Sequence, residues 1–294
     1  VEVNPESATE EFLAAARNAG INRVSIGVQS LADNELKAVG RIHTTAQAVE
    51  AVRLARQLCF NSISADLIIG LPGQTWLTLN QSLDTLVGSG IEHLSLYCLS
   101  LEEGTPLAEN PPDDLPSDDM QAELFQQATS FLERHHYGHY EISNFTLKGY
   151  ECRHNLNYWR GGEYLGLGPS AASHLEGRRF RNRPHLDDYL DKPTCLIADS
   201  EVLPPKNKAS EEAMLRLRLL EEGIEINELT ARFGQDNIAA LIRRLDYMAV
   251  QGRLIADGST YRLPPSRVLT SNPIFAEVLE TCPDRIENFK PIQR

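Results

Sequence analysis

The stretch that most constrains this chain is Ser62–Thr75, with the sequence SISADLIIGLPGQT. Apolar residues from Ile63 to Ile69 are typical of a parallel strand buried on both faces. Asp66 interrupts the run, and a buried carboxylate needs a partner because an unpaired charge costs roughly several kcal/mol. The following Gly-Leu-Pro-Gly turn leads into a helix, and ligands of α/β sheets bind beside such turns. The stretch predicts a strand that opens onto a ligand site, although a lone Asp is equally compatible with a structural salt bridge.

Strands and helices alternate along the first part of the chain. Further strands are predicted at Arg23–Gln29 and His93–Leu99, and helices at Thr45–Leu58 and Thr75–Val87. A strand and helix period of roughly 30 residues indicates βαβ units, whose right-handed crossovers would wind a parallel sheet into an open or closed barrel. The expected fold class is therefore α/β.

The first residues predict one more strand and a capped helix. Val1–Asn4 alternates like the end of a strand, and Pro5 stops it. Ser7 and Glu10 have the spacing of a capping box for a helix over Glu11–Asn18. Because the chain starts without a methionine and inside a strand pattern, we expect that the first part of a longer protein is missing.

The pattern changes after Leu99. We expect an exposed acidic connection at residues 101–116 and a helix over 117–135 with Ser117 as its N-cap. Two extended aromatic segments are expected at 137–143 and 150–159, a glycine-rich turn at 161–168 and a linker at 204–208. The glycine-rich segment GGEYLGLG lacks the spacing of a phosphate-binding loop. It is expected to bring the backbone close to a ligand or to another loop.

The last third has the pattern of a separate unit. Three amphipathic helices are predicted at Ser210–Glu222, Ile226–Phe233 and Asn237–Gln251. A hairpin is predicted to follow, with its two strands at residues 253–256 and 260–263. This order is typical of a winged-helix unit, which either binds DNA or serves as a packing module, and the lack of a basic stripe favours packing. The expected domains are a barrel at 1–115, a barrel-closing α+β segment at 116–204 and a winged-helix-like domain with a tail at 205–294.

Composition limits the function classes. The formal net charge is −13, which argues against a nucleic-acid partner. The five cysteines are scattered without a CxxC or CxxxC pair, so neither a zinc site nor a disulfide framework is predicted, and a reducing, cytoplasmic setting is expected. No apolar run reaches the roughly 18 residues of a membrane-spanning helix.

Several segments in a fixed order carry a family resemblance; they are VEVNPES, RVSIGVQSL, GRIHT, SADLIIGLPGQT, HLSLYCLSLEEGTPL, CRHNLNYW and YLGLGPSAASH. Together they resemble radical S-adenosylmethionine (SAM) proteins of the oxygen-independent coproporphyrinogen III oxidase-like family, and within it the heme chaperone (HemW-like) branch. The resemblance covers nearly the whole chain. It implies a partial (β/α) barrel that holds a [4Fe-4S] cluster and SAM, followed by a small winged-helix-like domain.

The resemblance also implies SAM contacts at Glu2, Gln29, Arg41 and Asp66. Gln29 and Asp66 would hydrogen-bond the ribose hydroxyls, and Arg41 would clamp the carboxylate with two hydrogen bonds. Glu2 would lie near the amino group or the cationic sulfonium. Taken singly, each residue also has an ordinary structural explanation, such as a surface cation for Arg41.

The family's CxxxCxxC cluster motif and its glycine-rich loop for the SAM amine are absent from this sequence. Such a cluster is held by three thiolates, which the scattered cysteines do not supply. The resemblance therefore implies cluster ligands upstream of Val1. By itself, the chain is expected to be unable to form a radical from SAM.

The segment HNLNYW resembles the one that marks the heme chaperone branch, and it carries His154, Asn155, Tyr158 and Trp159. A neutral imidazole is a good ligand of heme iron, and aromatic rings can stack on a flat macrocycle. His154 is therefore the candidate iron ligand, and we expect it to be more enclosed than His43, which we place in a loop. The alternative is structural, with His154 capping a strand and Trp159 filling the core.

Three functions remain open at this point. The first is a chaperone that binds heme and passes it to acceptor proteins, including proteins at the membrane surface. The second is a radical SAM decarboxylase acting on coproporphyrinogen III in porphyrin biosynthesis, and the third is a structural winged-helix protein, which the charge disfavours. If His154 is not the iron ligand, His174 in GLGPSAASH is the next candidate. The sequence does not indicate the acceptor, the fate of SAM or the oligomeric state.

Overall fold

The computed structural model describes residues 1–191 and 196–280. Contacts between residues divide the chain into two compact units, Val1–Glu151 and Cys152–Arg294. The barrel-closing segment expected at 116–204 is divided between the two units. Its residues 116–151 belong to the first unit, and its residues 152–204 belong to the second. The boundary falls just before the HNLNYW residues.

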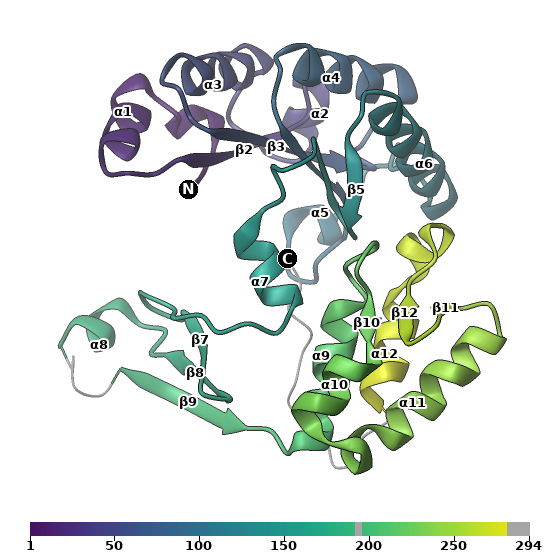
Figure 1. The fold of residues 1–294 in the computed structure, drawn as a ribbon. Helices are drawn as coiled ribbons and strands as arrows, with labels where there is room; N and C mark the ends of the chain where they lie inside the picture. The colour runs from purple at the N-terminus through teal and green to yellow at the C-terminus, as the bar shows by residue number, and fades with distance from the viewer. Residues whose placement is uncertain (192–195, 281–294) are drawn as a thin grey trace. The chain divides into compact units, whose positions relative to one another are not determined.

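The first unit is built on a six-stranded sheet (Figure 1). Its strand order is β1-β2-β3-β4-β6-β5; neighbouring strands from β1 to β4 are parallel, whereas β6 is antiparallel to both β4 and β5. The strands are β1 (Glu2–Val3), β2 (Arg23–Gln29), β3 (Ser62–Ile69), β4 (His93–Cys98), β5 (Gly138–Glu141) and β6 (Asn144–Thr146). The predicted parallel strands are confirmed, and the sequence did not indicate the antiparallel pairing of β6.

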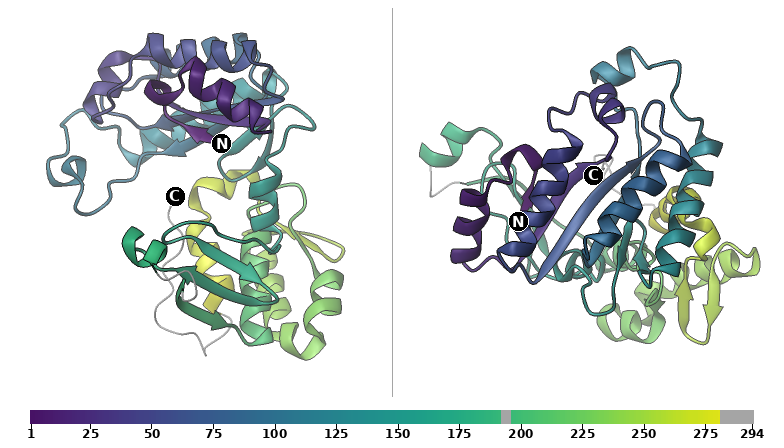
Figure 2. Two further views of the ribbon diagram at one scale, coloured as in Figure 1. Left: turned by 90° about the vertical axis from the view of Figure 1, so that its left-hand side faces the viewer. Right: turned by 90° about the horizontal axis from the view of Figure 1, so that it is seen from above.

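Helices cover one face of this sheet, as Figures 1 and 2 show. They include α1 (Glu10–Asn18), α2 (Asp33–Ala38), α3 (Thr45–Gln57), α4 (Trp76–Gly88) and α6 (Asp118–Arg134), and the shorter η1 (Pro5–Ser7) and α5 (Pro106–Glu109) belong to the same unit. Thr44, Thr75 and Ser117 cap α3, α4 and α6 with side-chain oxygens that accept from backbone N–H groups. The predicted capping box of Ser7 and Glu10 is wrong, because Ser7 ends η1 and Thr9 caps α1.

The two faces of the sheet differ in chemistry. The helix-covered face carries apolar side chains with almost no solvent exposure; they include Val24, Ile26, Ile63, Ala65, Leu67, Leu94 and Leu96. Alternate residues on the other face are small or polar; they include Ser25, Gly27, Ser64, Asp66, His93 and Ser95. The predicted burial of β3 on both faces is confirmed at Ser64, but the predicted nearly continuous apolar run is wrong, because the second face is polar. Asp66 lies on a polar face and does not break a buried apolar run.

The second unit begins with α7 (Arg153–Trp159), which precedes an antiparallel sheet of β7, β8 and β9. Its strands are β7 (Ala172–Leu175), β8 (Arg178–Asn182) and β9 (Ile197–Val202), and α8 (Leu186–Asp191) follows β8 in the chain. The extended conformation predicted for 150–159 is wrong over α7. Aromatic content favours strands, but His154 and Tyr158, four residues apart, contact each other as neighbours on one helix face.

A helical bundle and a small sheet complete the second unit. The helices are α9 (Pro205–Arg216), α10 (Ile226–Phe233), α11 (Gln235–Val250) and α12 (Asn272–Glu280), preceded by η2 (Pro265–Thr270); the sheet joins β10 (Ile224–Glu225), β12 (Thr260–Arg262) and β11 (Ile255–Asp257). The predicted order of three helices and a hairpin is present. The linker predicted at 204–208 is wrong, because Pro205 starts α9, where its missing N–H is not needed.

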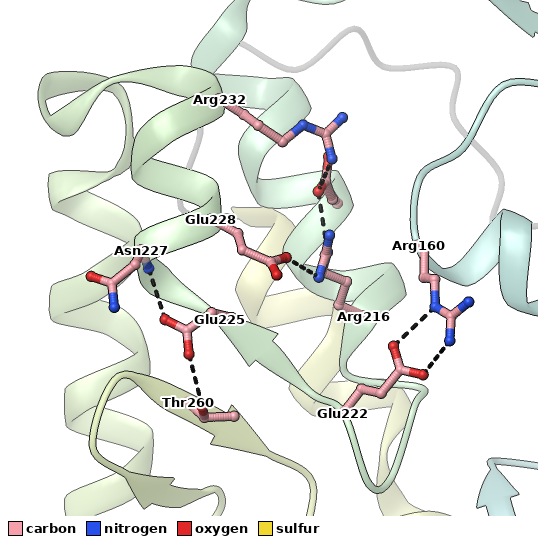
Figure 3. Close-up of polar contacts among 9 residues, drawn as sticks. Arg160, Arg216, Glu222, Glu225, Asn227, Glu228, Arg232 and Thr260 are labelled. Atoms are coloured by element: carbon pink, nitrogen blue, oxygen red, sulfur yellow. Dashed lines mark hydrogen bonds and ion pairs between the residues drawn. The ribbon is translucent and has the colours of Figure 1, made fainter.

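Ion pairs join the helices of this second unit (Figure 3). Glu212 of α9, with a side chain that is 3% exposed, pairs with Arg216 at 3.1 Å and with Arg232 of α10 at 2.5 Å. Burial raises the pKa of Glu212, although both guanidinium groups oppose the rise. Arg160, directly after α7, makes two exposed hydrogen bonds to Glu222. These contacts hold α10 and the end of α7 to the segment around α9.

Candidate functional site

The polar face of the β1–β4 sheet carries two of the residues predicted to contact SAM. β1 and β3 flank β2, so Glu2 and Asp66 lie on either side of the strand that contains Ser25 and Gly27. Glu2 is exposed, and its negative charge acts on Asp66. The fold therefore brings these two residues, which are far apart in sequence, to one place.

Gln29 lies near Gly27 of its own strand, and Arg41 is linked to this place through Asn4. Gln29 ends β2 at a bulge with a left-handed φ of +65°, which is uncommon outside glycine. Its Nε2 and the Oδ1 of Asn4 lie 3.0 Å and 3.2 Å from the position that a Cβ on Gly27 would take. Arg41 donates from Nη1 to Asn4 Oδ1 at 3.3 Å. Asn4 thus belongs to this cluster, and sequence reasoning missed it although it stands in VEVNPES.

Asp66 is a partly buried carboxyl group. Ser25 donates to its Oδ1 at 3.2 Å, and Ser95 supplies a second hydrogen bond. Burial raises the pKa of Asp66 above its ordinary value of 3.8, the two hydrogen bonds lower it, and Glu2 raises it. The remaining lone pairs can accept hydrogen bonds from a hydroxyl or an ammonium group of a ligand.

A hydrogen-bonded chain crosses the same face beside Asp66. Ser64 Oγ lies 2.8 Å from His93 Nδ1, and Tyr140 Oη lies 2.9 Å from His93 Nε2. Burial lowers the pKa of His93 well below its usual range, so the imidazole is neutral at physiological pH. With both nitrogens paired, His93 is a fixed part of the polar face, a role that no sequence motif indicated.

His43 is buried, so the expectation that it is less enclosed than His154 is wrong. Its Nε2 donates to the carbonyl oxygen of Val28 at 3.0 Å, and its Nδ1 lies 3.5 Å from Oε2 of Glu6. The imidazole therefore connects the loop that follows Arg41 with the end of β2, whereas its Nδ1 makes no hydrogen bond among the described residues. These are segments that also adjoin the other predicted SAM contacts.

The predicted heme segment lies on α7 in the second unit. His154 is exposed there, whereas Asn155, Tyr158 and Trp159 are partly buried. The His154 ring meets Tyr158 edge-on, with 4.7 Å between centroids, and Tyr158 contacts Tyr164 at 4.3 Å. The enclosed surroundings expected for His154 are absent because it lies in the exposed first turn of α7.

Trp159 packs against the helical bundle of its own unit. The guanidinium carbon of Arg218 lies 4.9 Å from the Trp159 ring centroid and 4.8 Å from that of Phe275 in α12. At these distances the cation is attracted to both rings. The Trp159 Nε1 is buried and has no hydrogen-bond partner within the described ranges. Trp159 therefore anchors α7, while His154 remains accessible.

No group of three His, Cys, Asp or Glu side chains among the described residues is placed to hold a metal ion. Cys59 and Cys98 are exposed thiols outside any disulfide. Cys195 and Cys282 lie outside the described residues. The described side chains therefore do not fit a [4Fe-4S] cluster, which needs three thiolates. No helix within residues 1–191 and 196–280 is long and apolar enough to cross a membrane.

Comparison with known proteins places these features in a family. Residues 1–86 match the model of the Radical SAM superfamily. The chain is 34% identical to the heme chaperone HemW of Lactococcus lactis, over 79% of this chain and 62% of that protein. It is 32% identical to HemW of Bacillus subtilis, over 95% of this chain and 75% of that protein. The chain thus spans less than two thirds of the Lactococcus protein but three quarters of the Bacillus one.

A solved structure has a similar fold. Coproporphyrinogen III oxidase (HemN) from Escherichia coli superposes with a TM-score of 0.78 at 19% identity, covering 95% of this chain and 68% of that chain. At this identity the likeness establishes the fold alone, and it confirms the α/β radical SAM fold. The resemblance indicated by the sequence motifs is confirmed by the relatives. The chain therefore belongs to the HemW family of radical SAM proteins.

Proposed function

We propose that this protein is a chaperone that binds heme and delivers it to acceptor proteins. The observation that carries the proposal is the position of HNLNYW on α7, with exposed His154 in ring contact with Tyr158. An imidazole can contact a porphyrin or ligate its iron, and a tyrosine ring can stack on the macrocycle. Relatives named heme chaperones at 32% and 34% identity support the same function.

His154, Asn155, Tyr158 and Trp159 make up the proposed heme-contact segment. Trp159 keeps α7 against the bundle through Arg218, so the other three residues are presented from a fixed helix. A chaperone must also release its cargo, and a partly exposed site permits faster dissociation than an enclosed pocket. The exposure of His154 is therefore compatible with a transfer function.

A SAM site in the first unit is the second part of the proposal. Arg41 would bind the carboxylate of SAM, Asp66 and Gln29 its ribose hydroxyls, and Glu2 its cationic end. The cluster of Asn4, Gln29 and Arg41 around Gly27 supports this assignment. We further propose that β1–β4 and their helices form part of a radical SAM (β/α) barrel and that α9–α11 with the β11–β12 hairpin form a winged-helix-like module.

Heme binding and transfer need no radical step. We therefore assign no reaction to bound SAM. Reducing conditions keep scattered thiols such as Cys59 free, and we place the activity in the cytoplasm for that reason. The partners in this proposal are heme and a heme-accepting protein.

Heme transfer is the test. The protein is loaded with hemin, freed of excess and mixed with apomyoglobin, and the myoglobin Soret band is followed over time. Transfer is expected, and a Tyr158→Ala variant should load less hemin. Conversion of coproporphyrinogen to decarboxylated product by the same preparation would instead support the oxidase. Failure of the wild-type protein to bind hemin would contradict the proposal.

A further inference from the structure

A row of aromatic rings runs from α7 to β7 in the second unit. His154 contacts Tyr158 with 4.7 Å between ring centroids, Tyr158 contacts Tyr164 at 4.3 Å, and Tyr164 lies 6.1 Å from His174. One imidazole therefore stands at each end of a tyrosine pair. These four residues come from two elements and the loop between them, and the fold alone aligns them.

The two imidazoles are held very differently. His174 is half-buried in β7, and both of its backbone hydrogen bonds go to Tyr164, each at 2.9 Å. Its Nδ1 lies 3.1 Å from the carbonyl oxygen of Gly162. Because a carbonyl oxygen only accepts, Nδ1 must carry the proton, and Nε2 keeps its lone pair. His154, by contrast, is exposed, and its ring has no hydrogen bond that orients it among the described residues.

The arrangement of His174 is the one that metal-binding histidines adopt. A ligating imidazole usually donates its second N–H to a carbonyl or carboxylate oxygen, which fixes both the tautomer and the ring orientation. Gly162 supplies that carbonyl in this chain. The loop that follows also presents Leu165 and Leu167, which are 60% and 81% exposed, close in sequence to Tyr164. Apolar surface of this kind is suited to contact with a porphyrin.

We propose that His174, through Nε2, is the axial ligand of heme iron in this protein, with Tyr158 and Tyr164 as its aromatic neighbours. The inference rests on the proposed heme-binding function and assigns the iron ligand within it. His154 then contacts the heme without ligating the metal. Binding forms one Fe–N bond to a neutral imidazole and needs no change in oxidation state.

Hemin titration of the whole chain tests this assignment, with absorbance and thermal melts recorded on the same samples. His174→Ala should change the Soret band and weaken hemin binding by roughly tenfold or more. Mutation of a residue that merely supports a metal ligand already weakens binding by this much. His154→Ala should keep the wild-type Soret position. His185→Ala is the matched control, because His185 is an exposed histidine in the same unit and outside the aromatic row.

Chemical rescue separates ligation from a structural role. In His174→Gly, added imidazole should restore the wild-type Soret position, which a merely structural histidine would not permit. The assignment is overturned if His154→Ala shifts the band while His174→Ala does not, or if imidazole leaves a folded His174→Gly protein unchanged. A wild-type chain that binds no hemin would refute the proposed function itself, so the two failures are distinguishable.

Discussion

Replacing Asp66 with Asn is expected to stabilise the protein at neutral pH. Burial and the charge of Glu2 raise the pKa of Asp66 above 3.8, against the hydrogen bonds from Ser95 and Ser25. An acid with a raised pKa is harder to ionise in the folded state, so the wild type loses stability as pH rises from 3.8 through the raised pKa. Because Asn stays neutral, the melting-temperature advantage of Asp66→Asn should be largest at neutral pH and should shrink under acid.

The same change should weaken SAM binding. Ser25 and Ser95 use only part of the acceptor capacity of Asp66, which leaves lone pairs for a ribose hydroxyl. Asn replaces one carboxylate oxygen with an NH₂ group and removes the charge. The loss of one hydrogen bond to a charged group is worth about 1.5–3 kcal/mol, which corresponds to roughly 10- to 150-fold weaker binding.

Equilibrium dialysis with labelled SAM and thermal melts from acidic to neutral pH measure both effects. Asp33→Asn is the matched control, because Asp33 is exposed and accepts from the Thr45 backbone N–H at 2.7 Å, which lowers its pKa. This control should therefore be less stable than wild type at neutral pH, with the difference vanishing as pH falls through the lowered pKa, and its SAM affinity should not change.

The reasoning fails if Asp66→Asn binds SAM as tightly as the wild type in a folded protein. It also fails if the variant melts lower at neutral pH. That result would mean that the hydrogen bonds from Ser25 and Ser95 stabilise the charged carboxylate by more than burial and Glu2 destabilise it.

Three further changes test other parts of the structure, each by urea denaturation. Ser64→Ala should lower the free energy of unfolding by about 1–3 kcal/mol, because it leaves the buried Nδ1 of His93 without its partner; no measurable loss would show that this hydrogen bond is replaced. Glu212→Ala should cost about 3–5 kcal/mol, because it removes the buried anion that Arg216 and Arg232 share, and a neutral outcome would contradict the pairing in Figure 3. Arg160→Ala should cost about 1 kcal/mol or less, because its pair with Glu222 is solvated, and a larger loss would mean that this pair fixes α7.

Local patterns were sufficient for much of the fold. The strand Arg23–Gln29, the helix Ile226–Phe233 and the Ser117 cap were predicted from sequence and found at those residues. Each depends on side-chain periodicity or on one capping residue, which are properties of neighbouring positions along the chain. Family membership was also determined from the sequence, because the order of the family's motifs can be recognised without knowledge of their contacts.

Other assignments failed where nearby residues alone are ambiguous. The aromatic residues of HNLNYW suit a strand by composition, but packing of Trp159 against Arg218 of a distant segment selects a helix. Ser64 and Asp66 alternate with Ala65 and Leu67 in the sequence, but only the tertiary structure shows that helices cover one side of the sheet and leave the polar side without them. These choices depend on partners from distant segments.

The sequence by itself determined the alternation of strands and helices and the family, and it indicated candidate residues for SAM and heme. Only the tertiary structure decided that His43 is buried, that Asn4 joins Gln29 and Arg41 at Gly27, and that His154 is exposed. It also aligned Gly162 with His174 and so fixed which imidazole nitrogen keeps a lone pair. The physical reason is that propensity and periodicity act between neighbours in the chain, whereas burial, hydrogen-bond partners and ring orientation are set by contacts across the sheets and between segments distant in sequence.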